Sequence, residues 1–195
     1  MGRICYINGI PYLVTLPTGG HTKKDHNNQW DHLIDCLDLP ADDLDRIIHW
    51  KGLFSMCNEK DSYLRCCTIR GYSTARNWQY FSYNHTDEYV GFRPVFVPLN
   101  PTTLRPDSSI LKELSNGQCV SFGSFSLGQK IVKPPQNVTA EGDIPDYEPE
   151  ADLSFGSLKS GYGFHVIKVD GWLITDRVLI KNISWKDLKN LGYAD

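Results

Sequence analysis

Three features are absent from this sequence of 195 residues, and each absence excludes a class of protein. No apolar run is long enough to span a bilayer. The formal net charge is −3, so the excess of basic residues that binds nucleic acid is missing. Residues 1–7 lack the apolar core of a secretory signal peptide, and polar Asn8-Gly9 follows at once. We therefore expect no nucleic-acid partner, no membrane partner and no secretion by a signal peptide.

The Cys-x-x-Cys spacing of many metal sites is also absent. Six cysteines occur without a signal peptide, which favours reduced thiols. Cys66 and Cys67 are adjacent, so on a strand they point to opposite faces and cannot easily share one metal. His21, His26 and His32 match no zinc template. We expect no metal and no cofactor.

The amino-acid composition is that of a globular protein. Hydrophobic residues make up 41% of the chain, aromatic residues 12% and charged residues only 22%. Such a composition can bury a core and is not that of a disordered chain. Many aromatic residues with few charges also suit a protein that makes protein contacts.

Local patterns in the first half predict a hairpin, a helix and several strands. Residues 3–16 alternate around the turn signal Asn8-Gly9. An early helix is predicted from apolar residues at helical spacing, with Asn27 or Asn28 as its cap. A second short helix is predicted over 44–48. The strands are predicted at 63–69, 79–83 and 89–97, the last with a free edge or a bulge at Pro94.

A proline-rich, polar stretch at 100–109 predicts a linker between two domains, 1–99 and 110–195. The second domain is predicted to be small and β-rich. Its elements are a helical turn at 111–114, strands at 118–125 and 130–132, and a hairpin over 162–179. A final helix is capped by Ser184, with Asp187 at N3 in an imperfect capping box. The expected fold class is α+β.

Two short motifs support a more specific expectation. They are Arg70-Gly71-Tyr72-Ser73 and Gly91-Phe92-Arg93-Pro94-Val95-Phe96, and an early helix with Trp30 precedes both. This arrangement resembles the C-type-lectin fold of formylglycine-generating-enzyme relatives and of diversity-generating-retroelement variable proteins. Phage and prophage proteins share the pattern, and residues 173–185 also resemble the ending of phage structural proteins.

The resemblance covers residues 1–99 and implies a C-type-lectin-like domain there. It implies a structural core that includes Trp30, Arg70, Phe92 and Arg93. It also implies a ligand-binding face on the segment 74–85. Trp, Tyr and Arg dominate binding hot spots, so the expected contact residues are Arg76, Trp78, Tyr80, Ser82, Tyr83 and His85. On a strand, Trp78, Tyr80 and Ser82 would share one face, and packing of these aromatics inside the protein is the alternative.

Two arginines carry explicit expectations. A buried guanidinium needs a carboxylate or several carbonyls, so Arg93 should have such partners, with Asp61, Asp87 and Glu88 nearest in sequence. Asp176 and Arg177 are adjacent and would face opposite ways on a strand, so we expect no pairing between them.

No catalytic constellation emerges from the sequence. The metal-binding cysteine pair of formylglycine-generating enzymes is not offered by residues 64–68, and a Cys–His pair with His49 or His85 cannot be assembled from sequence. Residues 121–124 lack the Gly-x-Ser-x-Gly elbow. The acidic stretch 143–152 lacks the spacing of a calcium loop, and we interpret it as a solvated loop or as a contact arm for a basic partner.

The leading hypothesis is a non-enzymatic, phage-encoded structural or binding protein of the tail, baseplate or capsid surface. Its partners would be other virion proteins or a second copy, and it would be found in the virion or the host cytoplasm. One alternative is an intracellular anti-defence inhibitor that acts by protein–protein binding. The other is a module that binds a glycan or a host receptor.

Overall fold

The computed structural model describes residues 2–20, 27–37, 49, 52–61, 63–100, 109–136 and 143–195. Its elements, in chain order, are β1 (Arg3–Ile7), β2 (Ile10–Thr15), α1 (Gln29–Leu37), β3 (Phe54–Asp61), β4 (Cys66–Gly71), β5 (Trp78–Ser82), β6 (Val90–Phe92), β7 (Val95–Pro98), α3 (Ser109–Glu113), β8 (Cys119–Leu127), β9 (Lys130–Val132), β10 (Leu153–Ser157), β11 (Phe164–Val169), β12 (Trp172–Thr175), β13 (Ile180–Lys181) and α4 (Trp185–Asn190).

Strands dominate this architecture, so the expected α+β class is wrong. The protein is largely all-β, with 45% strand and 11% helix, in a curled sheet and a second sheet. The three described helices are short because few stretches keep a helical apolar period, whereas β-branched and aromatic residues recur throughout. The predicted helix at 44–48 lies outside the described residues. Among the described residues, no helix has the length and apolar character needed to cross a membrane.

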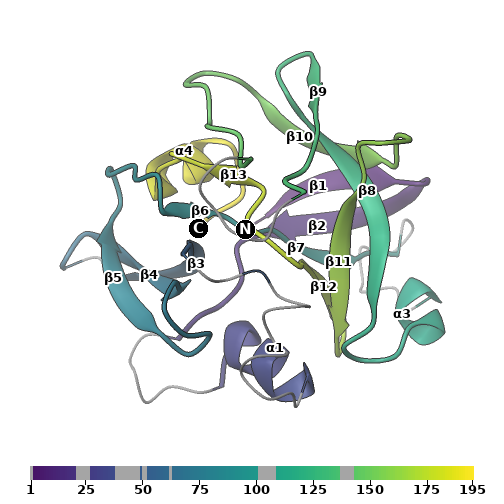
Figure 1. Ribbon diagram of the computed structural model, residues 1–195, viewed down its shortest axis with the longest axis horizontal. Helices are drawn as coiled ribbons and strands as arrows, with labels where there is room; N and C mark the ends of the chain where they lie inside the picture. Colours follow the sequence, from purple (N-terminus) through teal and green to yellow (C-terminus); the bar gives the residue numbers. More distant parts are fainter. Residues whose placement is uncertain are drawn as a thin grey trace.

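The larger sheet has eight strands in the order β1-β2-β7-β12-β11-β8-β10, with β9 paired to β8. It curls until its two ends meet, as Figure 1 shows on the side opposite β5. Arg3 on β1 donates to the carbonyl of Leu153 on β10 at 3.1 Å. At the tip of the β1–β2 hairpin, the amide of Asn8 donates to Ser157 Oγ at 2.8 Å. A cluster of aromatic side chains fills the inside of the curl: Tyr12, Phe96, Phe122, Phe125, Phe155 and Phe164.

The smaller sheet has five strands in the order β13-β6-β3-β4-β5. Only the β3–β6 pair is parallel. Apolar residues of this sheet, including Met56, Ile69 and Phe92, join the same core as the curled sheet. The last strand in the order, β5, forms the outer left side of the molecule in Figure 1.

The expected 89–97 strand is split between the two sheets. β6 pairs with β3 and β13, whereas β7 pairs with β2 and β12. The chain crosses at Arg93-Pro94, where a proline cannot donate to a ladder. Pro94 therefore marks a passage between sheets, which is neither the free edge nor the bulge that we expected.

Both sheets combine strands from before and after residues 100–109. β12 pairs with β7, and β13 pairs with β6. The boundary expected between 1–99 and 110–195 therefore does not divide the sheets or their shared core. Of the expected linker, residues 101–108 lie outside the described residues.

Several local predictions are confirmed. Asn8 and Gly9 both have positive φ, 52° and 80°, in the turn between β1 and β2. α1 buries its apolar face, Trp30, Leu33, Ile34 and Leu37, on the outer side of β7, β11 and β12. Ser184 and Asp187 form a complete capping box at the start of α4.

Candidate functional site

The expected contact residues lie on or beside β5, the outer strand of the smaller sheet. β5 pairs with β4 in a register that joins Cys66 to Ser82 and Arg70 to Trp78. Because side chains alternate along a strand, Trp78, Tyr80 and Ser82 share one face and Phe81 lies on the other. Phe81 and Tyr83 pack against the main core. The face of β5 that packs on the core is therefore the one that carries Gln79 and Phe81.

The six expected contact residues differ in exposure. Arg76, Tyr80, Ser82 and His85 are exposed, whereas Trp78 and Tyr83 are half-buried. His85 lies edge-on to Phe81, at 5.5 Å between ring centroids.

The indole of Trp78 contacts the Tyr80 ring at 4.6 Å and donates to the carbonyl of Gly20 at 3.3 Å. Trp78 is thus partly a packing residue, and Tyr80, with 42% of its surface exposed, is the better contact residue.

Tyr83 has a structural role. Its ring stacks on Trp185 of α4 at 4.8 Å, with 27° between the ring planes. Its hydroxyl is buried and has no hydrogen-bond partner among the described residues, and burial raises the pKa of that hydroxyl. A side chain held in this way cannot serve as a contact residue without leaving α4, so Tyr83 belongs to the packing and not to the surface.

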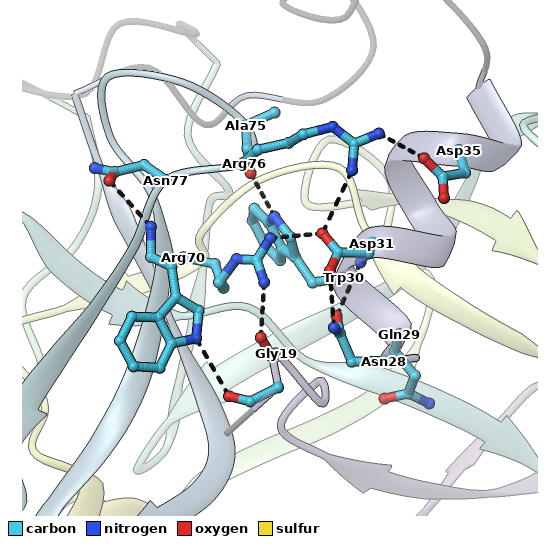
Figure 2. Close-up of polar contacts among 12 residues, drawn as sticks. Gly19, Asn28, Gln29, Trp30, Asp31, Asp35, Arg70, Ala75, Arg76 and Asn77 are labelled. Carbon is cyan, nitrogen blue, oxygen red and sulfur yellow. Dashed lines mark hydrogen bonds and ion pairs between the residues drawn. The ribbon is translucent and has the colours of Figure 1, made fainter. Parts of the chain in front are cut away.

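Arg76 joins the turn before β5 to the helix α1. Its guanidinium donates to Asp35 Oδ1 at 2.6 Å and lies 3.7 Å from Asp31 Oδ1. Figure 2 shows this guanidinium between the two carboxylates. The Asp35 pair is exposed and contributes little free energy by itself. Its effect is to orient Arg76 toward α1 and away from the Trp78–Tyr80 face.

Beneath this turn lies a buried ion pair. Arg70 on β4 donates to Asp31 Oδ1 at 2.6 Å and to the carbonyl of Gly19 at 2.7 Å. Asn28 accepts from the amide of Asp31 and donates to its carboxylate, which caps α1. The indole of Trp30 donates to the carbonyl of Ala75 at 2.6 Å (Figure 2). These contacts position the 72–77 turn and hence the start of β5.

Arg93 is fully buried and is held by oxygens that lie far away in sequence. It donates to Ser55 Oγ and to the carbonyl of Thr175, both at 2.9 Å, and to the carbonyl of His49 at 2.5 Å. Its guanidinium also lies 5.4 Å from the centre of the Trp30 ring. Burial lowers the pKa of Arg93 to about 9, and the nearby Asp176 carboxylate opposes that shift. Arg93 therefore stays charged at neutral pH.

The acidic residues proposed as partners of Arg93 do not bind its guanidinium. Asp61 accepts from the amides of Tyr63 and Leu64, and Asp87 accepts from the amide of Tyr89. Glu88 is exposed. The sequence left two kinds of partner open for Arg93, a carboxylate or several carbonyls. The structure shows the second kind, with two carbonyls and the Ser55 hydroxyl accepting from Arg93.

Asp176 and Arg177 do pair, contrary to expectation. Arg177 Nε and a terminal nitrogen donate to the two oxygens of Asp176 at 2.9 and 2.7 Å. The prediction assumed a strand, but β12 ends at Thr175, so the two side chains are free to turn toward each other. The buried Asp176 carboxylate also lies 3.7 Å from His49 Nε2.

Two further candidate contact residues are not indicated by the sequence patterns above. Tyr63 and Leu64 are 93% and 54% exposed at the turn between β3 and β4. The sequence pattern predicts Tyr63 at the start of a strand, but Asp61 Oδ1 accepts from the amides of Tyr63 and Leu64 at 2.9 Å and holds a turn there. The signal was present as an aspartate two residues before the aromatic residue, a spacing that favours an Asx turn.

Tyr63, Leu64, Trp78 and Tyr80 together define what we call the β5 surface. Tyr63 and Leu64 precede β4, and the amide of Tyr83, just after β5, donates to the carbonyl of Arg65 at 3.2 Å. The turn and the end of β5 are thereby joined. Tyr80 lies on the same face of β5 as Ser82. Ser82 pairs with Cys66, the first residue of β4, which follows the turn that carries Tyr63 and Leu64.

The acidic stretch is partly neutralised by the chain itself. Asp152 forms an ion pair with Arg3 at 2.6 Å, and this contact lowers the pKa of the Asp152 carboxyl. Asp146 accepts from Asn182 at 2.7 Å and lies 3.9 Å from Lys181 Nζ. Asp143, Glu148 and Glu150 are exposed. The pairing reduces the charge that a contact arm could offer to a basic partner.

The thiols of the chain are poorly suited to nucleophilic chemistry. All six cysteines are free, and burial raises the pKa of each. The pKa reaches about 12 for Cys5 and Cys67 and about 11 for Cys119. A reactive cysteine needs the opposite shift.

Metal ligands do not gather in the described part of the chain, where no group of three or more His, Cys, Asp or Glu side chains could hold an ion. His21 and His26 lie outside the described residues.

Comparison of the chain with protein-family models, with curated proteins and with solved structures gave no match.

Proposed function

We propose that this chain is a non-enzymatic binding protein that contacts a protein partner through the β5 surface. The observation that carries the proposal is Tyr63, which is 93% exposed beside the exposed Leu64 on a turn held by Asp61. A tyrosine this exposed contributes nothing to the core. Exposed apolar side chains that gather in one place typically mark an interaction site.

The energetics favour such a role. Burying a large apolar side chain contributes about 1.5–3 kcal/mol, and Tyr and Trp are enriched among binding hot spots. The Asp61 hydrogen bonds hold the turn before any partner arrives, which lowers the entropy cost of binding. Arg76 and Tyr83, by contrast, are engaged within the protein, and we remove them from the proposed contact set.

The context we propose is a phage-encoded accessory protein of the tail, baseplate or capsid surface. Its support is the resemblance of residues 91–96 and 173–185 to phage proteins. The partner would be another virion protein or a second copy of the chain. Purified phage particles should then contain this chain. Particles that lack it would contradict the virion assignment but not the proposed binding role.

Site-specific photo-crosslinking tests the β5 surface directly. Benzoylphenylalanine replaces Tyr63 in one variant and Tyr162 in a matched control, since Tyr162 is also exposed, at 40%, on the loop before β11. In cells that make the particle, position 63 should crosslink to one defined partner or to a second copy. Position 162 should not crosslink to that partner. No product from position 63, or the same products from both positions, would contradict the proposal.

A double variant supplies a second readout. Tyr63→Ala with Leu64→Ala should abolish the interaction found by crosslinking, and Leu158→Ala with Tyr162→Ala should preserve it. Both pairs remove exposed side chains, so the thermal midpoint should move by only a few degrees in either case.

A further inference from the structure

A small pocket lies at the start of α1. Its volume is about 210 Å³. Pockets for drug-sized ligands have volumes of roughly 300–1,000 Å³, so this one suits a single small ring. Among the described residues, its lining is Thr18, Asn27, Asn28, Gln29, His32, Asp170 and Trp172.

The pocket wall is held in place by reciprocal hydrogen bonds. The amide of Thr18 donates to Gln29 Oε1 at 3.0 Å, and the amide of Gln29 donates to Thr18 Oγ1 at 2.8 Å. The amide of Trp30 donates to the carbonyl of Thr18 at 2.9 Å. Figure 2 shows Gln29 beside Asn28 at the beginning of the helix. A site built on such fixed elements needs little rearrangement when a ligand binds.

The opposite wall comes from the turn between β11 and β12. Asp170 accepts at Oδ1 from Asn116 Nδ2, at 3.1 Å, and its other oxygen lies 3.5 Å from His32 Nδ1. Trp172 is half-buried, with part of its side chain packed under α1. An aromatic side chain and a carboxylate therefore lie beside the helix terminus.

The hydrogen-bonding groups that face the pocket include both donors and acceptors. Gln29 uses its Oε1, and within the described part of the chain nothing accepts from its Nε2. Thr18 Oγ1 accepts from Gln29, which leaves its hydroxyl hydrogen to donate. Asp170 and His32 add acceptors and donors. A ligand that both donates and accepts at several hydroxyl groups fits this set.

We infer that this pocket binds a single neutral sugar ring. The apolar face of a pyranose can lie on Trp172, and its hydroxyl groups can bond to the amide, hydroxyl, carboxylate and imidazole groups around it. Among the described lining residues, Asp170 brings a carboxylate and none is a lysine or an arginine, a combination that disfavours an anionic ligand. None of the described lining residues belongs to the β5 surface, and neither proposal depends on the other.

Saturation-transfer NMR tests the inference with the whole chain. The probes are glucose, galactose, mannose and N-acetylglucosamine, each at about 10 mM, because a small ligand with few atoms binds with a dissociation constant on the order of 1 mM. At least one sugar should receive saturation from the wild-type protein. No transfer to any of the four would overturn the inference.

Substitutions locate the binding. Trp172→Leu keeps apolar bulk without the ring, and Asp170→Asn keeps the size of the side chain without its charge. Loss of transfer in either variant, with Tyr162→Leu unaffected, supports the pocket. Transfer that persists in both variants, or that disappears in Tyr162→Leu, overturns it. Trp172→Leu should leave crosslinking from position 63 unchanged, so the two proposals can fail separately.

Discussion

Arg70 and Asp31 form a 2.6 Å ion pair across 39 positions of sequence, and both side chains are buried. The pair joins β4 to α1 and lies directly below the turn that begins β5. Removing one partner of a buried pair leaves the other charge without compensation, which costs more than losing a surface contact. The pair is therefore one of the contacts that link α1 to the turn before β5, together with the Trp30–Ala75 hydrogen bond.

The first prediction concerns this pair. Asp31→Ala should lower the free energy of unfolding by about 3–5 kcal/mol, because it leaves Arg70 buried with an uncompensated charge. Asp35→Ala is the matched control, since it removes an exposed aspartate of the same helix and should cost at most about 1 kcal/mol. Urea denaturation measures both. Equal losses in the two variants would show that the buried pair contributes no more than the exposed one.

The second prediction concerns Tyr72, which follows Gly71 and has a φ of 77°. The left-handed region costs a residue with a Cβ about 1–2 kcal/mol and costs glycine nothing. Tyr72 is held there by its hydrogen bond to the carbonyl of Leu53 and by its stack on Phe54, at 4.9 Å.

Two variants separate the backbone strain from the ring contact. Tyr72→Ala and Tyr72→Gly both lose the stack, but only glycine relieves the strain. The glycine variant should therefore be more stable than the alanine variant by about 1 kcal/mol in urea denaturation. An alanine variant as stable as the glycine variant would mean that the turn relaxes when the ring is gone.

The third prediction is a loss of stability at alkaline pH. Burial raises the pKa of Cys5 and Cys67 to about 12, against about 8.5 for an unfolded thiol. Below pH 8.5 both states hold the proton, and the stabilising contribution is complete. As the pH rises toward 12, the unfolded state releases protons that the folded state retains, so stability falls by up to about 1.4 kcal/mol per pH unit for each thiol.

Denaturation in urea at pH 7 and at pH 10, with reductant present, measures this loss. The Cys5→Ala/Cys67→Ala double variant should lose less stability than the wild type between the two pH values. If its pH dependence equals that of the wild type, these two thiols are not the cause.

Local sequence signals predicted local structure well where neighbours along the chain decide the conformation. The Asn8-Gly9 turn, the buried face of α1 and the capping box at Ser184 all depend on residues a few positions apart. Tyr63 was misplaced for a related reason. An Asx turn competes with a strand at that point, and the aspartate outweighs the strand preference of the aromatic residue.

Local sequence signals could not predict the fold class, nor that strands from both halves of the chain share the same sheets. Val95, which extends the apolar pattern of residues 90–92, belongs to a different sheet, because the pattern does not say which strand will pair with it. The candidate site shows the same limit. Arg76 and Tyr83 appear on the expected segment, but Asp35 and Trp185 engage them from distant elements.

The sequence alone determined the turns and caps and, for a buried Arg93, the need for a carboxylate or several carbonyls, because these follow from local spacing and from hydrogen-bonding chemistry. Only the tertiary structure decided which oxygens bind Arg93, how the strands before and after residues 100–109 share two sheets, and which aromatic side chains remain outside. The Arg93 hydrogen bonds alone join residues 38 to 82 positions apart, which no local pattern encodes.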